Sequence, residues 1–293
     1  RYDQFRRAKK GEIQIIVGPR SALFTPFSEL GLIIIDEEHE QTYKSETSPR
    51  YHAGEVAVKR AEMEGAKVIF GSATPSLESY TKAVNGEYLL VKLKDRYLSR
   101  SLPEVSVVDL REELRAGNRS VLSRKLEKAI DRRLAQREQT ILFLNRRGYA
   151  GFVSCRSCGT VLKCPHCDVA LSEHKNGRML CHYCGYERTA VKNCPVCGSP
   201  YIGGFKAGTQ QIEQVLQKKF PGAKILRMDY DTTRTKGSYE QILSSFAAHE
   251  ADILVGTQMI VKGHDFPDVT LVGVIAADLS LNAADYRCAE RTF

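Results

Sequence analysis

Eight cysteines gathered between Cys155 and Cys197 constrain this chain more than any other feature. They form four Cys-x-x-Cys pairs: Cys155/Cys158, Cys164/Cys167, Cys181/Cys184 and Cys194/Cys197. Two thiolates two residues apart on a tight turn can both bind one tetrahedral Zn²⁺, so the four pairs supply ligands for two zinc ions. The alternatives are a disulfide framework, a redox pair and an iron–sulfur site. A disulfide framework is typical of small secreted chains and a redox pair usually occurs once, so we expect two Zn²⁺.

The spacing of the pairs indicates which of them share a metal. Five residues separate the first pair from the second, thirteen the second from the third, and nine the third from the fourth. Thirteen residues suffice for a hairpin, whereas five make a very tight link. We therefore predict a nested arrangement, with pairing of the first two pairs as the alternative. Zinc 1 would bind Cys155, Cys158, Cys194 and Cys197, and zinc 2 would bind Cys164, Cys167, Cys181 and Cys184. The ninth cysteine, Cys288, is expected to be an ordinary small apolar residue.

Outside the cysteine-rich segment, short apolar runs alternate with helical patterns. Strands are predicted at 13–17, 32–35, 67–70, 105–108, 140–144, 224–227, 252–255 and 270–276, and helices at 52–64, 76–83, 123–137, 209–220 and 236–247. Short apolar strands separated by helices are typical of parallel sheets with covered faces. We expect an α/β fold with two parallel-sheet lobes and a cysteine-rich insertion in the second.

The expected domains follow from these patterns. Residues 1–100 would form the C-terminal part of a first lobe and 101–150 the start of a second. Residues 151–204 would form the zinc-binding insertion and 205–293 the rest of the second lobe. A charged stretch over 92–119, with Pro103 inside it, is predicted to link the lobes.

Charge and hydropathy limit the class of protein. The chain has 43 basic and 35 acidic residues, a net charge of +8. Basic globular proteins often bind nucleic acid, although many bind none. No apolar run reaches the length of a transmembrane helix, and we expect no membrane partner. The charged first residues do not read as a secretory signal, and there is no initiator methionine. We expect a segment of a longer protein.

Polar residues follow two of the predicted strands. Asp36, Glu37, Glu38 and His39 come directly after the run 32–35. In open α/β sheets ligands bind at the carboxyl ends of strands, where one carboxylate can hold Mg²⁺ and a neighbour can activate a water that attacks phosphate. The alternative is a solvated acidic turn. Ser72, Ala73 and Thr74 follow the run 67–70, and their hydroxyl groups could bond the neighbouring strand end or cap the next helix.

These motifs resemble those of the bacterial primosomal protein N′ (PriA) family, replication-restart helicases of superfamily 2. The DEEH and SAT sequences resemble motifs II and III. Residues 17–24, 142–149, 256–267 and 285–291 resemble, in order, the DNA-contacting segment ahead of motif II, the motif IV region, motif V and the approach to motif VI. The segment like motif IV leads straight into an eight-cysteine insertion, as in the family. The resemblance covers nearly the whole chain.

The resemblance implies two RecA-like lobes, the first only partial here, with ATP bound between them. Asp36 would coordinate Mg²⁺ and Glu37 would activate the attacking water, within a catalytic set that also includes Glu38 and His39. His39 and the SAT residues would couple the ATP state to DNA contact. The further nucleotide or coupling residues would be Gly256, Thr257, Gln258, Lys262, Gly263 and Asp265.

The implied activity is that of an ATP-dependent 3′-to-5′ DNA helicase that recognises stalled or abandoned forks and initiates primosome assembly. Its implied partners are forked and single-stranded DNA, single-stranded-DNA-binding protein and primosome proteins, in the bacterial cytoplasm at the nucleoid. The loop 41–51 interleaves aromatic and basic side chains, a pattern suited to stacked bases beside phosphates, although an ordinary polar loop is the alternative. The expected DNA contacts are Arg20, Ser21, Tyr43, Lys44, Arg50, Tyr51, Asn145, Arg146 and Arg147.

Some family features are missing from the sequence. No G-x-x-x-x-G-K-[ST] loop occurs, and in the family it lies upstream of Arg1. The arginine finger of motif VI would lie just past Phe293, so we expect this segment alone not to hydrolyse ATP efficiently. Pro19 and Val261 stand where the family suggests Thr and Ala. Two other functions remain open: a zinc-ribbon nucleic-acid-binding module without motor activity, and another nucleotide-dependent translocase or restriction-type subunit.

Overall fold

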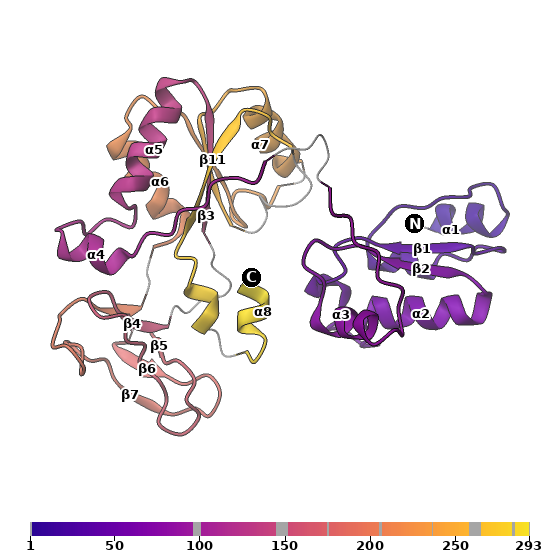
Figure 1. Ribbon diagram of the computed structural model, residues 1–293, viewed down its shortest axis with the longest axis horizontal. Coiled ribbons are helices and arrows are strands. Elements are labelled where there is room, and N and C mark those ends of the chain that lie inside the picture. The colour runs from indigo at the N-terminus through magenta and orange to yellow at the C-terminus, as the bar shows by residue number, and fades with distance from the viewer. Residues whose placement is uncertain are drawn as a thin grey trace. The chain divides into compact units, whose positions relative to one another are not determined.

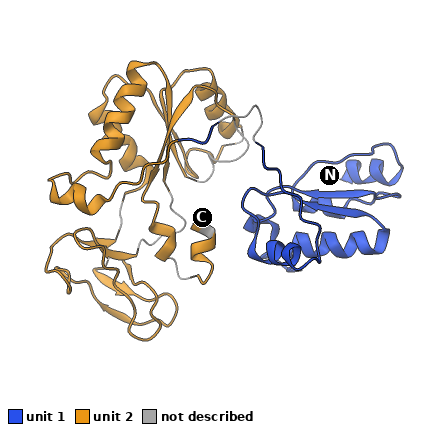
Figure 2. Ribbon diagram, in the orientation of Figure 1, with its two compact units in different colours: residues 1–103 blue, residues 104–293 orange. Residues whose placement is uncertain are grey.

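The computed structural model describes residues 2–95, 101–144, 152–174, 176–204, 207–235, 237–257, 265–282 and 285–292. The chain divides into two compact units, unit 1 (Arg1–Pro103) and unit 2 (Glu104–Phe293), which are coloured separately in Figure 2. None of the helices in these ranges has the length and the apolar run that crossing a bilayer would require.

Unit 1 is built on two parallel strands and the helix that connects them. Strand β1 (Leu32–Ile35) pairs in register with β2 (Lys67–Phe70), and α2 (Ala53–Glu64) contacts both strands. Buried alanines on α2 let the helix approach the strands closely, and the helix is followed by Gly65, whose φ of 68° suits glycine. The other elements are α1 (Tyr2–Lys9), two 3₁₀ helices (Arg20–Phe24 and Gln41–Tyr43) and α3 (Leu77–Val84).

Unit 2 contains a parallel four-stranded sheet in the order β11-β3-β10-β9. Its strands are β3 (Gln139–Leu144), β9 (Ile225–Met228), β10 (Ile253–Gly256) and β11 (Val269–Ile275), and its helices are α5 (Arg124–Ala135), α6 (Thr209–Lys219) and α7 (Ser238–Ala247). In Figure 1, α5 and α6 cover one face of this sheet and α7 covers the other. Strand β10 is therefore buried on both sides.

Alternation along β10 divides the core of unit 2. Ile253 and Val255 lie in the cluster that contains residues of α5 and α6, whereas Leu254 packs in the cluster with Phe246 of α7. Successive strand residues point to opposite faces, so a strand covered on both faces is apolar throughout. On β11, a Cβ added at Gly273 would lie 2.7 Å from Leu142 Cδ2, so glycine is needed for close packing here.

Residues 152–204, which we call the cysteine-rich insertion, carry two small antiparallel sheets. One pairs β4 (Val153–Cys155) with β8 (Ile202–Gly204), and the other runs β5-β6-β7. The latter strands are β5 (Ser172–Glu173), β6 (Arg178–Leu180) and β7 (Glu187–Thr189). The buried side chains form a cluster that includes Leu171, Met179 and two cysteines. The remaining elements of unit 2 are α4 (Leu110–Arg115), a 3₁₀ helix (Leu279–Asn282) and α8 (Cys288–Thr292).

The α/β class, the parallel strands and the antiparallel hairpin inside the insertion are confirmed. Helix and strand bounds agree with the predicted ranges to within a few residues, except at two apolar runs. The predicted strands at 13–17 and 105–108 are wrong, since neither pairs with another strand among the described residues. Val17 and Val107 are each 94% exposed. In these two places the β-branched run has no neighbouring strand to pair with among the described residues, and without one it does not form a strand. The predicted linker 92–119 also contains α4, which the charged sequence concealed.

Candidate metal centres and candidate active site

The eight clustered cysteines form two groups, arranged as the nested pairing predicted. Centre 1 consists of Cys155, Cys158, Cys194 and Cys197, and centre 2 of Cys164, Cys167, Cys181 and Cys184. Within each group the four sulfurs lie within 4.8 Å of one another. The Sγ–Sγ distances are 3.6 Å for Cys155–Cys197, 3.7 Å for Cys158–Cys194 and 3.6 Å for Cys164–Cys184.

These distances fit tetrahedral zinc. Four Zn–S bonds of about 2.3 Å at tetrahedral angles put the sulfurs about 3.8 Å apart, whereas a disulfide bond is about 2.05 Å long. Each centre therefore fits one zinc ion, and none of the nine cysteines forms a disulfide bond. Cys288, at the start of α8, belongs to neither centre.

The same backbone turn builds all four knuckles. The residue after each second cysteine has a positive φ: 81° at Gly159, 56° at Asp168, 77° at Gly185 and 70° at Gly198. Its N–H donates to the carbonyl of the first cysteine of the pair, at 2.8 to 3.0 Å. Left-handed backbone favours glycine, and aspartate is one of the few other residues that adopt it readily. The glycines after the cysteines are thus the sequence signal for these turns.

The acidic motif of unit 1 lies at the carboxyl end of β1. Asp36 and Glu37 are exposed, and the N–H of Glu37 donates to Asp36 Oδ1 at 3.0 Å. Glu37 has a φ of 48°, an uncommon backbone conformation for this residue type. Its carboxylate Oε2 lies 3.5 Å from His39 Nδ1. Two carboxylates are therefore presented to solvent where ligands of parallel sheets usually bind.

His39 and Glu38 join this motif to the segment after β2. His39 Nδ1 lies 2.7 Å from Ser72 Oγ, which also accepts a hydrogen bond from the N–H of Thr74 at 3.0 Å. Glu38 is only 6% exposed and turns toward the start of α3. Its carboxylate accepts hydrogen bonds from the N–H of Ser76 at 2.6 Å, from the Ser76 hydroxyl at 3.1 Å and from the Ser79 hydroxyl at 3.0 Å. We infer that Glu38 positions the motif, because its carboxylate is occupied at the helix start.

Replacement of Glu38 by glutamine should loosen α3. The change removes a negative charge at a helix N-terminus and puts an NH₂ group where an oxygen now accepts a hydrogen bond. It should lower the free energy of unfolding of this helix by about 1–2 kcal/mol. Amide hydrogen exchange over residues 76–84 should become about 5- to 30-fold faster. Glu46→Gln, at an exposed loop residue, is the matched control and should leave this exchange unchanged. Equal exchange in the two variants would refute the positioning role.

The loop after the acidic motif is held by two side chains expected to contact DNA. Arg20 Nη1 donates to the carbonyls of Thr42 at 2.7 Å and Lys44 at 2.9 Å. The Tyr43 hydroxyl donates to the backbone carbonyl of Asp36 at 2.7 Å. Partial burial and the nearby carboxylates, Asp36 foremost, raise the pKa of Tyr43, so this hydroxyl stays protonated and able to donate. The loop is thus tied directly to the acidic motif.

The other residues expected to contact DNA fall into two groups. Lys44 and Arg50 are exposed, Ser21 is half-buried, and the half-buried Tyr51 ring meets the Phe24 ring edge-on at 5.3 Å between centroids. Asn145, Arg146 and Arg147 lie outside the described residues.

Among the residues expected to contact nucleotide or to couple, Gln258, Lys262 and Gly263 also lie outside the described residues. Of the remaining coupling residues, Gly256 ends β10 and is buried, the Thr257 N–H faces the Met228 carbonyl at 3.4 Å, and Asp265 is exposed.

Asp229, which the sequence analysis did not single out, organises the carboxyl end of β9. Its carboxylate accepts the Thr209 hydroxyl at 2.5 Å, and the N–H groups of Asp231 at 3.0 Å and Thr232 at 3.1 Å. Burial acts to raise the pKa of Asp229, but these hydrogen bonds and the Arg227 guanidinium outweigh it, so the pKa lies below its ordinary 3.8. A carboxylate two residues beyond the predicted strand 224–227 was the available signal.

The lowered pKa predicts an acid-dependent contribution to stability. A carboxylate whose pKa falls on folding stabilises the fold above its unfolded pKa, and the contribution is lost as pH decreases from about 3.8 through the folded pKa. Asp229→Asn should therefore reduce the free energy of unfolding by about 1–2 kcal/mol at pH 6 and by less at pH 3. Urea unfolding of both proteins at each pH measures this difference. An equal difference at both pH values would refute the assignment.

Comparison with known proteins adds the decisive observation. A model of the PriA DNA helicase Cys-rich region (CRR) domain matches residues 164–188, and one of the helicase conserved C-terminal domain matches residues 203–292. The replication restart protein PriA of Bacillus subtilis (strain 168) is 54% identical over 100% of this chain. Those of Synechocystis sp. and Haemophilus influenzae are 50% and 40% identical, over 100% and 97% of it. The chain belongs to the PriA family.

The PriA matches agree with the geometry described above. The Cys-rich region match contains all four cysteines of centre 2, and the helicase match contains α6 through β11 of the parallel sheet. The chain spans 36% of the length of the B. subtilis and Synechocystis PriA proteins and 39% of that of H. influenzae. Full-length PriA proteins are thus more than twice as long as this chain.

Proposed function

We propose that the full-length protein containing this chain is an ATP-dependent 3′-to-5′ DNA helicase. It would recognise stalled or abandoned replication forks and initiate primosome assembly for replication restart. The observation that carries this proposal is the match of the whole chain, at 54% identity, to a relative named replication restart protein PriA. The helicase match over residues 203–292 supports the motor activity.

The exposed carboxylates after β1 support the proposed chemistry. Asp36 would hold Mg²⁺ through oxygen ligands, and Glu37 would orient and deprotonate the water that attacks the terminal phosphate. The bound nucleotide would supply the free energy of its hydrolysis. The contact of His39 with Ser72 would pass a change at Glu37 to the segment after β2. We propose nucleotide or DNA contacts for Gly256, Thr257, Gln258, Lys262, Gly263 and Asp265.

The loop 41–51 would face single-stranded DNA. We propose direct contacts for the exposed Lys44 and Arg50, with Tyr51 available for stacking. Arg20 and Tyr43 already bond within unit 1, so we propose that they hold the loop in place. Ser21, Asn145, Arg146 and Arg147 stay predicted DNA contacts. Forked DNA, single-stranded-DNA-binding protein and primosome proteins are the proposed partners, in the bacterial cytoplasm at the nucleoid.

Unwinding assays with the full-length protein test the proposal. We expect ATP-dependent unwinding of forked DNA, with a preference for forks that carry a nascent leading strand. Zinc-containing protein that binds DNA without hydrolysing ATP would instead be a nucleic-acid-binding module. ATP-driven activity with no preference among forks would point to another class of translocase.

A further inference from the structure

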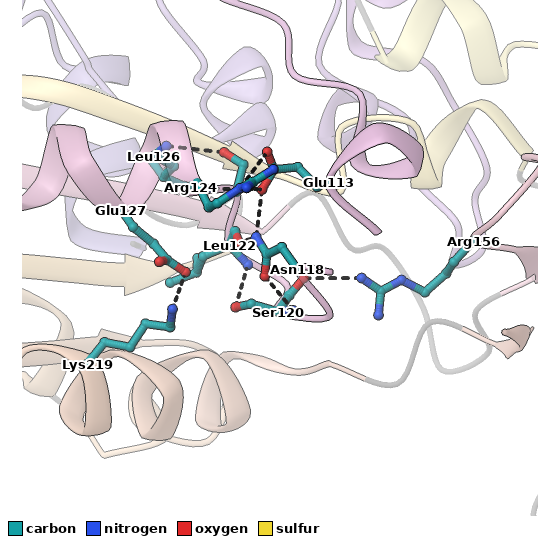
Figure 3. A network of polar contacts seen from close by, with 10 residues as sticks. Glu113, Asn118, Ser120, Leu122, Arg124, Leu126, Glu127, Arg156 and Lys219 are labelled. Atoms are coloured by element: carbon teal, nitrogen blue, oxygen red, sulfur yellow. Dashed lines mark hydrogen bonds and ion pairs between the residues drawn. The ribbon is translucent and has the colours of Figure 1, made fainter. Parts of the chain in front are cut away.

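The cysteine-rich insertion contacts the α5 side of unit 2 through centre 1. Arg156 lies inside the first knuckle, between Cys155 and Cys158. Its guanidinium donates to the backbone carbonyls of Arg119 and Ser120, at 3.1 Å each, through two different nitrogens. Figure 3 shows this side chain reaching from the insertion toward the loop around Asn118 and Ser120. Thirty-six residues or more separate the partners in sequence, so this is a long-range contact.

Further contacts lie around Arg156. The Arg119 guanidinium lies over the Tyr201 ring, 5.4 Å from its centroid, and the N–H of Arg156 donates to the Tyr201 carbonyl at 2.8 Å. The Arg111 side chain of α4 lies close to Gly159, the residue that follows Cys158. The incoming and outgoing segments of the insertion are joined at the same place, because β4 pairs with β8 and the Ser157 and Ser199 hydroxyls lie 2.7 Å apart. Centre 1 is therefore the base of the insertion.

The loop that accepts hydrogen bonds from Arg156, residues 117–123, is itself held by several hydrogen bonds. Asn118 donates to the Glu113 carboxylate at 2.6 Å and to the Leu122 carbonyl at 2.9 Å, and accepts from the N–H of Ser120 at 2.9 Å. Leu122 is fully buried in the core of the parallel sheet. Ser123 then caps α5, accepting from the Leu126 N–H at 3.1 Å. The carbonyls that face Arg156 are thus held at a constant position relative to the sheet.

The opposite end of this network continues to a second helix. Glu127 of α5 pairs with Lys219 of α6, and both helices pack on the sheet core that contains Leu142 and Ile253. Figure 3 places this pair in the same network as Asn118 and Arg156. A displacement of the sheet would therefore move the loop 117–123 with it.

We propose that Arg156 is a positioning residue that latches the zinc insertion to the parallel-sheet body of unit 2. The insertion and that body would then move together, so that motion driven by ATP is delivered to DNA through the insertion. This coupling rests on the proposed helicase function, whereas the latch itself does not. Two donors on one planar group fit two successive carbonyls, a geometry that lysine cannot reproduce.

The experiment uses the full-length protein with Arg156→Gln. The matched control is Arg188→Gln, the same change of charge at an exposed arginine on β7 of the insertion. Hydrogen exchange over residues 118–123 and 199–204 reports the latch without any need for activity. We expect exchange to become about tenfold faster in Arg156→Gln, the size expected from losing charge-assisted hydrogen bonds, and to be unchanged in Arg188→Gln. Unchanged exchange in both variants would overturn the latch.

The second readout is the ratio of forked DNA unwound to ATP hydrolysed. We expect this ratio to fall about fivefold to tenfold in Arg156→Gln, with DNA-stimulated ATPase within about twofold of the unsubstituted protein and two zinc ions still bound. Arg156→Lys, which keeps the charge and reaches one carbonyl at a time, should give an intermediate ratio. Loss of zinc in Arg156→Gln would overturn the positioning role, because the defect would then lie in centre 1.

Asn118→Ala tests the same latch from the other side without touching the knuckle. It should misplace the two carbonyls that accept from Arg156. Its effect on exchange over residues 199–204, away from the hydrogen bonds that Asn118 itself makes, should not add to that of Arg156→Gln, because both variants break the Arg156 contact. Full additivity would overturn the proposal. If the unsubstituted protein neither hydrolyses ATP nor unwinds DNA, the proposed function fails and the coupling with it, while the exchange measurements still decide the latch. Faster exchange with an unchanged ratio would overturn the coupling alone.

Discussion

A protein with serine in place of Cys164 is expected to bind one zinc ion per chain instead of two. Cys164 is 2% exposed and packs with Leu171 and Met179 in the small core of the insertion. Structural zinc contributes about 10–16 kcal/mol to the folding of small metal-binding domains, far more than a core of this size can replace. The β5-β6-β7 ribbon should therefore unfold around centre 2, while centre 1 keeps its four cysteines.

The same substitution should separate two activities of the full-length protein. We expect unwinding to be lost and most ATP hydrolysis to remain, since Asp36 and Glu37 belong to the other unit. Metal analysis gives the zinc content, and assays on forked DNA give the two rates. Cys288→Ser is the control, because Cys288 lies in neither centre, and it should keep both zinc ions. Equal loss of both activities would argue against this division of labour.

Replacement of Glu37 by glutamine is expected to abolish ATP turnover in the full-length protein. Removal of a positioned general base typically lowers the rate 10²- to 10⁴-fold, and the amide keeps the size of the side chain. Binding of ATP and of single-stranded DNA should stay within a few-fold, because Asp36 and the loop 41–51 are untouched. Steady-state hydrolysis with forked DNA, together with equilibrium binding of a non-hydrolysable analogue, measures the two effects.

The control for Glu37 is Glu29→Gln, which makes the same chemical change at an exposed loop position outside the acidic motif and the loop 41–51. It should hydrolyse ATP at the unsubstituted rate. Turnover that survives in Glu37→Gln would place the general base elsewhere. Loss of nucleotide binding together with turnover would mean that Glu37 contributes to binding of ATP before the reaction. The hydrolysis rate identifies the first outcome, and the binding measurement identifies the second.

Local sequence patterns were sufficient to predict most of the helices and strands. Strand β1 could be predicted because four apolar residues end abruptly at Asp36, and the nested zinc centres because residue spacing limits which turns can meet. The runs 13–17 and 105–108 have the same β-branched composition, yet they form no strand among the described residues. Strand formation depends on a partner that a single segment does not reveal.

Long-range contacts were beyond this kind of prediction. The sequence placed Glu38 among the catalytic candidates, but its carboxylate bonds Ser76 and Ser79, about forty residues away. Arg156 looked like one more basic residue within a knuckle, and its partners are backbone carbonyls, which carry no residue-specific signal. Such roles depend on how the chain returns on itself, which propensity and periodicity do not encode.

The nested order of the cysteines also sets a sequence of events during synthesis on the ribosome. The last ligand of centre 2, Cys184, emerges before Cys194 and Cys197, which centre 1 requires. Centre 2 can thus load its metal while centre 1 is still incomplete. Once it has done so, the long segment between Cys158 and Cys194 is already folded back on itself. This lowers the entropic cost of bringing Cys194 to Cys158 when centre 1 forms. The inner metal therefore prepares the chain to capture the outer one.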